Sequence, residues 1–295
     1  MRIFLTLLGL LLAYPAHAAI KVFACEPEWA ALAGELGVQN VYSATTAAQD
    51  PHFIEARPSL IAKVRSADLV VCTGLELEAG WLPALLQQSA NARVQPGRPG
   101  FFEAGAYVNK LEVPQRVDRA AGDVHAQGNP HIQQDPRNIA RIAAALTTRL
   151  SELDPGNAPE YQSRYKDFAA RWNAALERWQ QQAIPLKGVA AVVNHKSLSY
   201  LFNWLQMREV AALEPKPGIE PSAAHLNAIV AQLQRQPAQL IVRTNYEDGR
   251  AANWLSERSG LAAVVVASTI GGTPQAKDLF SMFDDTLRRL QAALK

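Results

Sequence analysis

The sequence has 295 residues, of which 48% are hydrophobic and 19% are charged, a composition typical of folded globular proteins. Lysine and arginine together number 29 against 27 aspartates and glutamates, so the net charge is only +2. Such a chain lacks the basic excess that binds a phosphate backbone, which disfavours a nucleic-acid partner. At this length two domains are expected rather than one.

The first 18 residues have the features of a cleaved secretory signal. Arg2 supplies a positive charge, residues 3–14 are predominantly apolar, and Ala16 to Ala18 form a small-x-small cleavage site. The apolar run is too short to span a bilayer, which takes about 20 residues. No cysteine follows the site, so a lipid anchor is not expected. We predict cleavage after Ala18 and export, into the periplasm if the cell is Gram-negative.

Short apolar strands alternate with helices through the next part of the chain. Strands are predicted at 20–25, 38–42 and 69–72, and helices at 28–36, 59–65 and 76–87. The Asp-Pro pair at 135–136 is typical of a helix N-terminus, and this helix is predicted to run to 153. The alternation indicates a parallel α/β sheet.

A longer helix is predicted at 159–182. Its apolar and aromatic residues recur every three or four positions and therefore share one face. These residues are Tyr161, Tyr165, Phe168, Trp172, Leu176 and Trp179. At about 1.5 Å per residue the helix would measure roughly 36 Å, more than one small lobe needs. We expect the aromatic face to pack against the body and the helix to connect two lobes.

The α/β alternation then resumes, with strands predicted at 189–193, 240–244 and 262–267 and helices at 198–205, 221–234, 249–259 and 279–294. The predicted fold class is therefore α/β, with two parallel-sheet lobes joined by one long rigid helix. The predicted division is a signal peptide at 1–18, an N-terminal lobe at 19–157, the connecting helix at 158–184 and a C-terminal lobe at 185–295.

The two cysteines, Cys25 and Cys72, each lie near the end of a predicted strand. An exported protein meets an oxidising environment, in which the pair can form a structural disulfide. Two buried free thiols are the alternative. A single pair is too few for a zinc-thiolate site.

Histidines at loop and strand ends are the candidate metal ligands. His52 and His131 follow a proline in the similar contexts Asp-Pro-His and Asn-Pro-His, and His195 follows the strand at 189–193. Open α/β sheets bind ligands at the carboxyl ends of their strands, and three imidazoles suit a borderline metal such as zinc. Any one of them taken alone is equally consistent with a solvated loop residue. His125 is an accessory candidate, whereas His225 is expected to be a surface or packing residue.

The sequence contains no hydrolytic zinc motif, no nucleophile elbow and no glycine-rich phosphate loop. A metal site without a nucleophile indicates binding and not catalysis.

These motifs resemble those of the zinc and manganese solute-binding proteins of metal ABC transporters. The resemblance covers essentially the whole chain after the signal, and it rests on residues 50–59, 67–78, 128–136, 194–195 and 220–226. It implies two lobes with the metal in the cleft between them, and zinc (Zn2+) as the cargo. It also implies a monomer whose partners are an ABC transporter permease in the inner membrane and a periplasmic metallochaperone.

The resemblance assigns His52 and His131 from the first lobe and His195 from the second as metal ligands. A histidine at the third of these positions implies zinc, and a carboxylate there implies manganese. The fourth family ligand is a carboxylate shortly before the last helix. Asp278 is the candidate for this role, although it lies one residue away from the expected position. Glu247 and a water are the alternatives. Binding is expected to fail as the histidines protonate near pH 6.

Other functions remain open at this point. Within binding proteins they are uptake of manganese, iron or a metal chelate, and an adhesin built on the same fold. From another class, a zinc-dependent hydrolase would need a general base, for which Glu247 or Glu220 is a candidate.

Overall fold

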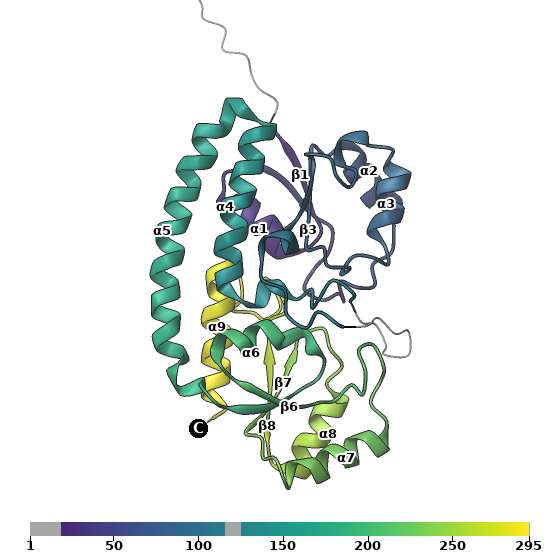
Figure 1. The fold of residues 1–295 in the computed structure, drawn as a ribbon, viewed down its shortest axis with the longest axis vertical. Coiled ribbons are helices and arrows are strands. Elements are labelled where there is room, and N and C mark those ends of the chain that lie inside the picture. Colours follow the sequence, from purple (N-terminus) through teal and green to yellow (C-terminus); the bar gives the residue numbers. More distant parts are fainter. Residues whose placement is uncertain (1–18, 116–124, 295) are drawn as a thin grey trace, which may run out of the picture.

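The computed structural model describes residues 19–115 and 125–294, so the predicted signal peptide lies outside the described residues. Figure 1 shows two α/β lobes arranged along the long axis, with one long helix lying beside both of them. The predicted fold class is confirmed.

The first lobe is built on a four-stranded parallel sheet with the strand order β2-β1-β3-β4. Its strands are β1 (Lys21–Ala24), β2 (Asn40–Ser43), β3 (Leu69–Cys72) and β4 (Phe101–Glu103). Its helices are α1 (Pro27–Glu35), α2 (Pro58–Ser66), α3 (Leu82–Ser89) and α4 (Pro136–Leu153). All four residues of β3 are buried, as expected of an inner strand covered on both faces.

The second lobe repeats this arrangement, because its parallel strands follow the equivalent order β6-β5-β7-β8. The strands are β5 (Ala190–Val193), β6 (Arg208–Ala212), β7 (Leu240–Thr244) and β8 (Ala262–Val266). The helices are α6 (Ser199–Leu205), α7 (Ala223–Leu233), α8 (Arg250–Ser259) and α9 (Leu279–Ala292).

The connecting helix is α5 (Ala158–Ala183), and its aromatic face packs inward as predicted. Phe168, Trp172 and Trp179 are fully buried. The indole of Trp172 donates a hydrogen bond to the carbonyl of Pro136 in α4 (2.9 Å), and that of Trp179 donates to Asp284 in α9 (2.6 Å). The helix is therefore fixed to an element of each lobe.

Further contacts join the lobes directly. One hydrophobic core extends from α1 and α4 through α5 into the second lobe. The Thr269 hydroxyl donates to the buried Glu28 carboxylate of α1 (2.5 Å), and the Gln134 amide donates to the carbonyl of Ser268 (2.8 Å). Opening the lobes widely would break these contacts, so we expect metal binding to involve small movements.

Three local features differ from the sequence prediction. β4 and β6 were not predicted, because both are short edge strands whose residues are partly exposed and give no apolar run. Helix α3 begins at Leu82 instead of residue 76. Leu75 and Glu76 have positive φ angles of 53° and 68°, and the Glu78 carboxylate accepts hydrogen bonds from the backbone N–H groups of Thr73 and Gly74. This turn uses the residues that would have formed the first helical turn.

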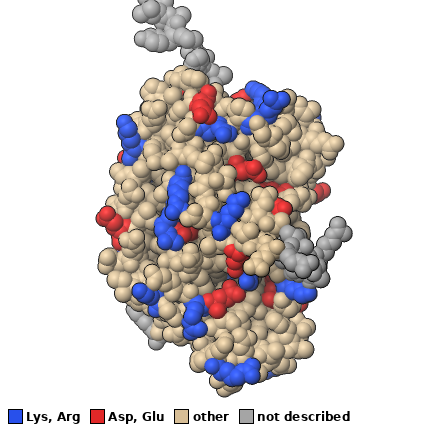
Figure 2. Space-filling view, in the orientation of Figure 1, with Lys and Arg blue, Asp and Glu red and all other residues tan. Residues whose placement is uncertain are grey.

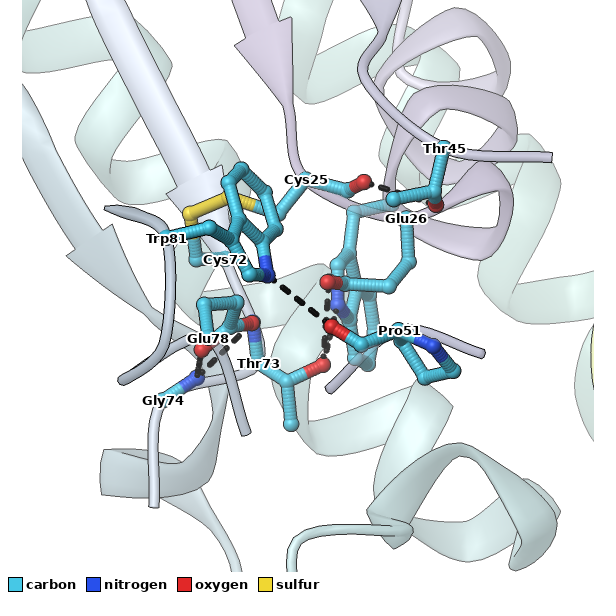
Figure 3. Close-up of a disulfide and its surroundings, with 10 residues drawn as sticks. Cys25, Glu26, Thr45, Pro51, Cys72, Thr73, Gly74, Glu78 and Trp81 are labelled. Carbon is cyan, nitrogen blue, oxygen red and sulfur yellow. Dashed lines mark hydrogen bonds between the residues drawn. A yellow bond between two sulfur atoms is a disulfide. The ribbon is translucent and has the colours of Figure 1, made fainter. Parts of the chain in front are cut away.

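The predicted disulfide between Cys25 and Cys72 is confirmed, with a Cα–Cα distance of 4.8 Å. It joins the carboxyl ends of β1 and β3, and both cysteines are fully buried. Figure 3 shows Trp81 beside this bond, with its indole nitrogen donating to the carbonyl of Pro51 (2.9 Å). The disulfide therefore lies in the packing that supports the loop of His52.

On the surface, basic and acidic side chains are intermingled over the face seen in Figure 2. Within residues 19–115 and 125–294 no helix combines the length and apolar character that crossing a membrane requires.

Candidate metal centre

Three histidines from separate loops meet between the lobes. His52 lies in the loop after β2, His131 lies directly before the short helical turn that leads into α4, and His195 follows β5. Each offers a ring nitrogen, and these nitrogens lie within 4.8 Å of one another. The structure thus brings together the three ligands predicted from sequence, two from the first lobe and one from the second.

The two Pro-His segments owe their shape to the residue before each proline. Asp50 accepts a hydrogen bond from the backbone N–H of His52 (3.0 Å), and Asn129 accepts one from that of His131 (2.9 Å). These are Asx turns, in which a short polar side chain replaces a backbone acceptor. The Asn129 amide also donates to the carbonyl of Lys196 (2.7 Å), which ties the loop of His131 to the segment beside His195.

Carboxylates orient two of the imidazoles. Asp50 lies 2.6 Å from Nδ1 of His52, and Glu214 lies 2.7 Å from Nδ1 of His195. A carboxylate at Nδ1 places the proton there and leaves Nε2 free to bind a metal, and it also makes the imidazole a stronger donor. The sequence analysis missed both roles. An acidic residue two positions before His52 was a usable signal, but Glu214 is distant from His195 in sequence.

His131 is the most enclosed of the three, with 3% of its surface exposed, and its Nε2 is buried without a hydrogen-bond partner among residues 19–115 and 125–294. Burial, with the nearby rings of His52 and His195 adding to it, holds the pKa of His131 well below its usual value. The ring is therefore neutral at physiological pH. A neutral imidazole with a buried, unpartnered nitrogen is suited to a metal ion.

His125 joins the cluster from another loop, since its Nε2 lies 3.3 Å from Nε2 of His52. Two nitrogens bound to one tetrahedral zinc at about 2.0–2.1 Å would lie about 3.3–3.4 Å apart. Burial lowers the pKa of His125 to about 4, with a contribution from His52, so this ring is also neutral. His125 is therefore a candidate fourth ligand beside His52, although it lies outside the group of three histidines whose ring nitrogens are all within 4.8 Å of one another.

The predicted fourth ligand, Asp278, is not brought to the cluster. It is the N-cap of α9, where its carboxylate accepts hydrogen bonds from the backbone N–H (2.7 Å) and the hydroxyl of Ser281 (2.8 Å). The alternative, Glu247, is buried near His195, but its carboxylate accepts from the Ser197 hydroxyl (2.8 Å) and the Thr244 N–H (2.7 Å).

Glu220 and His225, which were also considered from the sequence, lie outside the group of three candidate ligands. Glu220 is exposed at the margin of the neighbouring cavity. His225 lies on α7 with its Nε2 3.1 Å from the carbonyl of Ala212, in agreement with the expectation of a surface or packing residue.

The surroundings of His195, a candidate ligand, favour its protonated form. Burial lowers its pKa, but the hydrogen bond and charge of Glu214, aided by Glu247 and Asp50, outweigh burial and raise the pKa above the usual value. Metal and proton compete for this ring, so binding should weaken as the pH falls through the raised pKa of His195. His131 and His125 stay neutral in that range. Protonation of His195 should therefore set the pH below which metal binding weakens.

Replacing Glu214 by glutamine tests this account. At pH 7.5 we expect zinc affinity to fall by roughly 10- to 100-fold, as for other groups that orient a ligand. The pKa of His195 should fall in the variant, so proton competition weakens zinc binding only at lower pH than in wild type. The difference in zinc affinity between variant and wild type should therefore narrow towards pH 5.5. Competitive titration from pH 5.5 to 8 measures this gap. A gap that stays constant with pH, or an equal loss in the control E257Q on the exposed part of α8, would contradict it.

A family model described as the periplasmic component A of zinc-uptake complexes, ZnuA, matches residues 22–293. The chain belongs to this family.

Individual relatives of this ZnuA-family chain include both zinc and manganese proteins. The high-affinity zinc uptake protein ZnuA of Yersinia pestis is 25% identical over 200 residues, which are 64% of this chain and 63% of that protein, just under two thirds of its length. The metal ABC transporter substrate-binding lipoprotein SloC of Streptococcus mutans is 23% identical over 251 residues, 81% of this chain and 78% of that protein. The structure of FpvC from Pseudomonas aeruginosa in complex with Mn2+ matches with a TM-score of 0.78 at 20% identity, covering 94% of this chain and 99% of that one.

These comparisons confirm the predicted family, a group of zinc and manganese substrate-binding proteins of ABC transporters. They also confirm that the family is one of binding components and not of enzymes. The three candidate donors that meet in this ZnuA-family chain are imidazole nitrogens. Such donors suit zinc, whereas manganese prefers oxygen ligands.

Proposed function

We propose that this chain captures zinc after export into the periplasm and delivers it to the membrane permease of an ABC transporter. The observation that carries the proposal is the convergence of three imidazole nitrogens within 4.8 Å from both lobes. The imidazoles of His52 and His195 each have a carboxylate at Nδ1. Nε2 of His131 is buried and has no hydrogen-bond partner among the described residues. Family membership supports the transport role, and the signal-like residues 1–18 support export.

The zinc would be bound by His52, His131, His195 and His125. Asp50 and Glu214, which contact Nδ1 of His52 and His195, would balance its positive charge. Four imidazole nitrogens would match the tetrahedral coordination of zinc and offer manganese none of the oxygen ligands that it prefers. A metallochaperone that supplies the zinc, and a monomeric state, remain parts of the proposal taken from family resemblance.

Metal titration of residues 19–295 tests the proposal. After removal of metal, we expect one zinc per chain, and manganese bound at least 100-fold more weakly, measured by competition with a chromophoric chelator and by metal analysis. Equal or tighter manganese binding would overturn the choice of metal. Failure to bind either ion at pH 7.5 would overturn the capture function.

The fourth ligand is tested by comparing H125A with D278A. We expect H125A to weaken zinc binding by roughly tenfold or more, because it removes a nitrogen 3.3 Å from Nε2 of His52. D278A should leave zinc affinity within twofold of wild type. It should lower the free energy of unfolding by about 0.5–2 kcal/mol, because an N-cap is lost. The reverse pattern, with zinc binding lost only in D278A, would restore Asp278 as the ligand.

A further inference from the structure

A cavity of about 460 Å³ opens beside the histidine cluster, between the loop at Asp50–Phe53 in the first lobe and α8 with its neighbouring loops in the second. His52 and His195 form part of its wall. His125 and His131 instead line a separate cavity of about 240 Å³ that also contacts His195. The larger cavity therefore reaches the metal centre from a different side than His125 does.

This cavity is far larger than a metal ion requires. The ion would lie among the imidazole nitrogens themselves, and one water takes up about 30 Å³, so the cavity could hold about fifteen waters. Its volume lies within the range of about 300–1,000 Å³ that is typical of sites for small organic molecules. Capture of the bare ion leaves this volume unexplained.

The walls have the chemistry of an organic ligand site. Phe53, Leu226, Tyr246 and Trp254 present aromatic and aliphatic surface. Phe53 is 69% exposed at the cavity, an unusual position for a large apolar side chain. Aromatic surface with a few polar groups is typical of sites that enclose a small molecule with an apolar part.

The charged groups around the cavity are mostly acidic. Among the described residues that line the cavity, the acids are Asp50, Glu214, Glu220, Glu247 and Asp248, and the one basic residue is Arg250. Arg250 is paired with Asp248 at 2.5 Å. Asp50 and Glu214 face His52 and His195, and Asp248 faces Arg250, so the charge left for a ligand comes from Glu220 and Glu247. This remaining acidic charge disfavours a polycarboxylate and is compatible with a ligand that carries an amine.

We propose that this cavity is a subsite for an organic co-ligand of the metal, a chelator of amino-acid size that carries an amine and an apolar or aromatic part. The inference rests on the proposed metal-binding function and extends the cargo from the free ion to a metal–chelator complex. A donor atom of the chelator would reach the ion beside His52 and His195. It would raise the coordination number to five, which zinc accepts.

Zinc-loaded protein of residues 19–295, titrated with L-histidine or with citrate, tests the subsite. These probes are both zinc chelators, but only L-histidine carries an amine and an aromatic ring. Native mass spectrometry and calorimetry should show one L-histidine per zinc-loaded chain, bound at least tenfold more tightly than to the metal-free chain. Citrate should form no complex with the zinc-loaded chain. A citrate complex as strong as that of L-histidine would overturn the choice of ligand class.

Two cavity variants and a matched control locate the binding. A251W adds a large side chain from α8 into the cavity, and W254A removes an aromatic wall. Each should bind zinc in chelator-free buffer within about twofold of wild type and lose at least tenfold in L-histidine affinity. I184A, which removes another exposed apolar side chain outside the cavity, should change neither value. A251W removes no packed side chain, so it still tests the subsite if W254A does not fold.

The results separate the two proposals. Zinc binding without any L-histidine complex, or an L-histidine complex unaffected by A251W, would overturn the subsite and leave zinc capture standing. No zinc binding in chelator-free buffer and none in the presence of L-histidine would overturn both.

Discussion

Replacing His195 by alanine should weaken zinc binding by roughly 100- to 1,000-fold. Zinc sites contribute about 10–16 kcal/mol of binding free energy, so one of four ligands is worth about 2.5–4 kcal/mol. His195 is also the ligand supplied by the second lobe, and its Nδ1 is held by Glu214 at 2.7 Å. Its loss removes both a nitrogen donor and the link between the lobes through the metal. Competitive titration of H195A at pH 7.5 measures the change.

His225 provides the matched control for this experiment. It lies in the same lobe, but its Nε2 lies 3.1 Å from the carbonyl of Ala212, outside the cluster. H225A should bind zinc within twofold of wild type. Circular dichroism and thermal unfolding of both metal-free variants check that the fold is retained. A loss below tenfold in H195A, with the fold intact, would remove His195 from the ligand set.

Removing the disulfide should cost about 4 kcal/mol of the free energy of unfolding. Cys25 and Cys72 are separated by 47 residues, and closing a loop of that length restricts the unfolded chain by about this amount in the chain-entropy account. Both positions are fully buried, so serine replacements add the cost of burying hydroxyl groups. Urea unfolding of the metal-free double variant C25S/C72S measures the loss.

Reduction of the wild-type protein is the control for the double variant. Dithiothreitol should lower the wild-type urea midpoint towards that of the variant and leave the variant unchanged. Zinc affinity of the folded variant should stay within a few-fold of wild type, because the His52 loop is also held by the hydrogen bond from Trp81 to Pro51. A stability loss below 1 kcal/mol would show that the bond adds little to the packing of β1 against β3.

Much of the fold could be predicted from local patterns. The three- and four-residue spacing of Phe168, Trp172, Leu176 and Trp179 predicted the connecting helix, because side chains on one helical face recur with that period. Short apolar runs predicted the inner strands. The edge strands β4 and β6 gave no such signal, because their sequences, Phe-Phe-Glu and Arg-Glu-Val-Ala-Ala, contain no apolar run of strand length.

Asp278 shows how one residue can fit two patterns. A resemblance to family members gave it a role at the metal, whereas its position directly before an apolar helix is typical of an N-cap. The structure places its carboxylate on Ser281 at the start of α9. Local chemistry, in this case a capping interaction within three residues, was the better guide to its contacts.

The sequence by itself determined the residue types and the local turns of the candidate centre. The Asp-Pro-His and Asn-Pro-His segments contain their own hydrogen bonds, and His195 follows a strand whose apolar run is evident. Only the tertiary structure decided which ring nitrogens meet, that Glu214 orients His195, and that His125 lies 3.3 Å from His52. These contacts join segments that are far apart in sequence. The approach of His195 to His52 and His131 depends on how the two lobes pack, and the other two contacts depend on how loops meet within one lobe. No local spacing of residues encodes either.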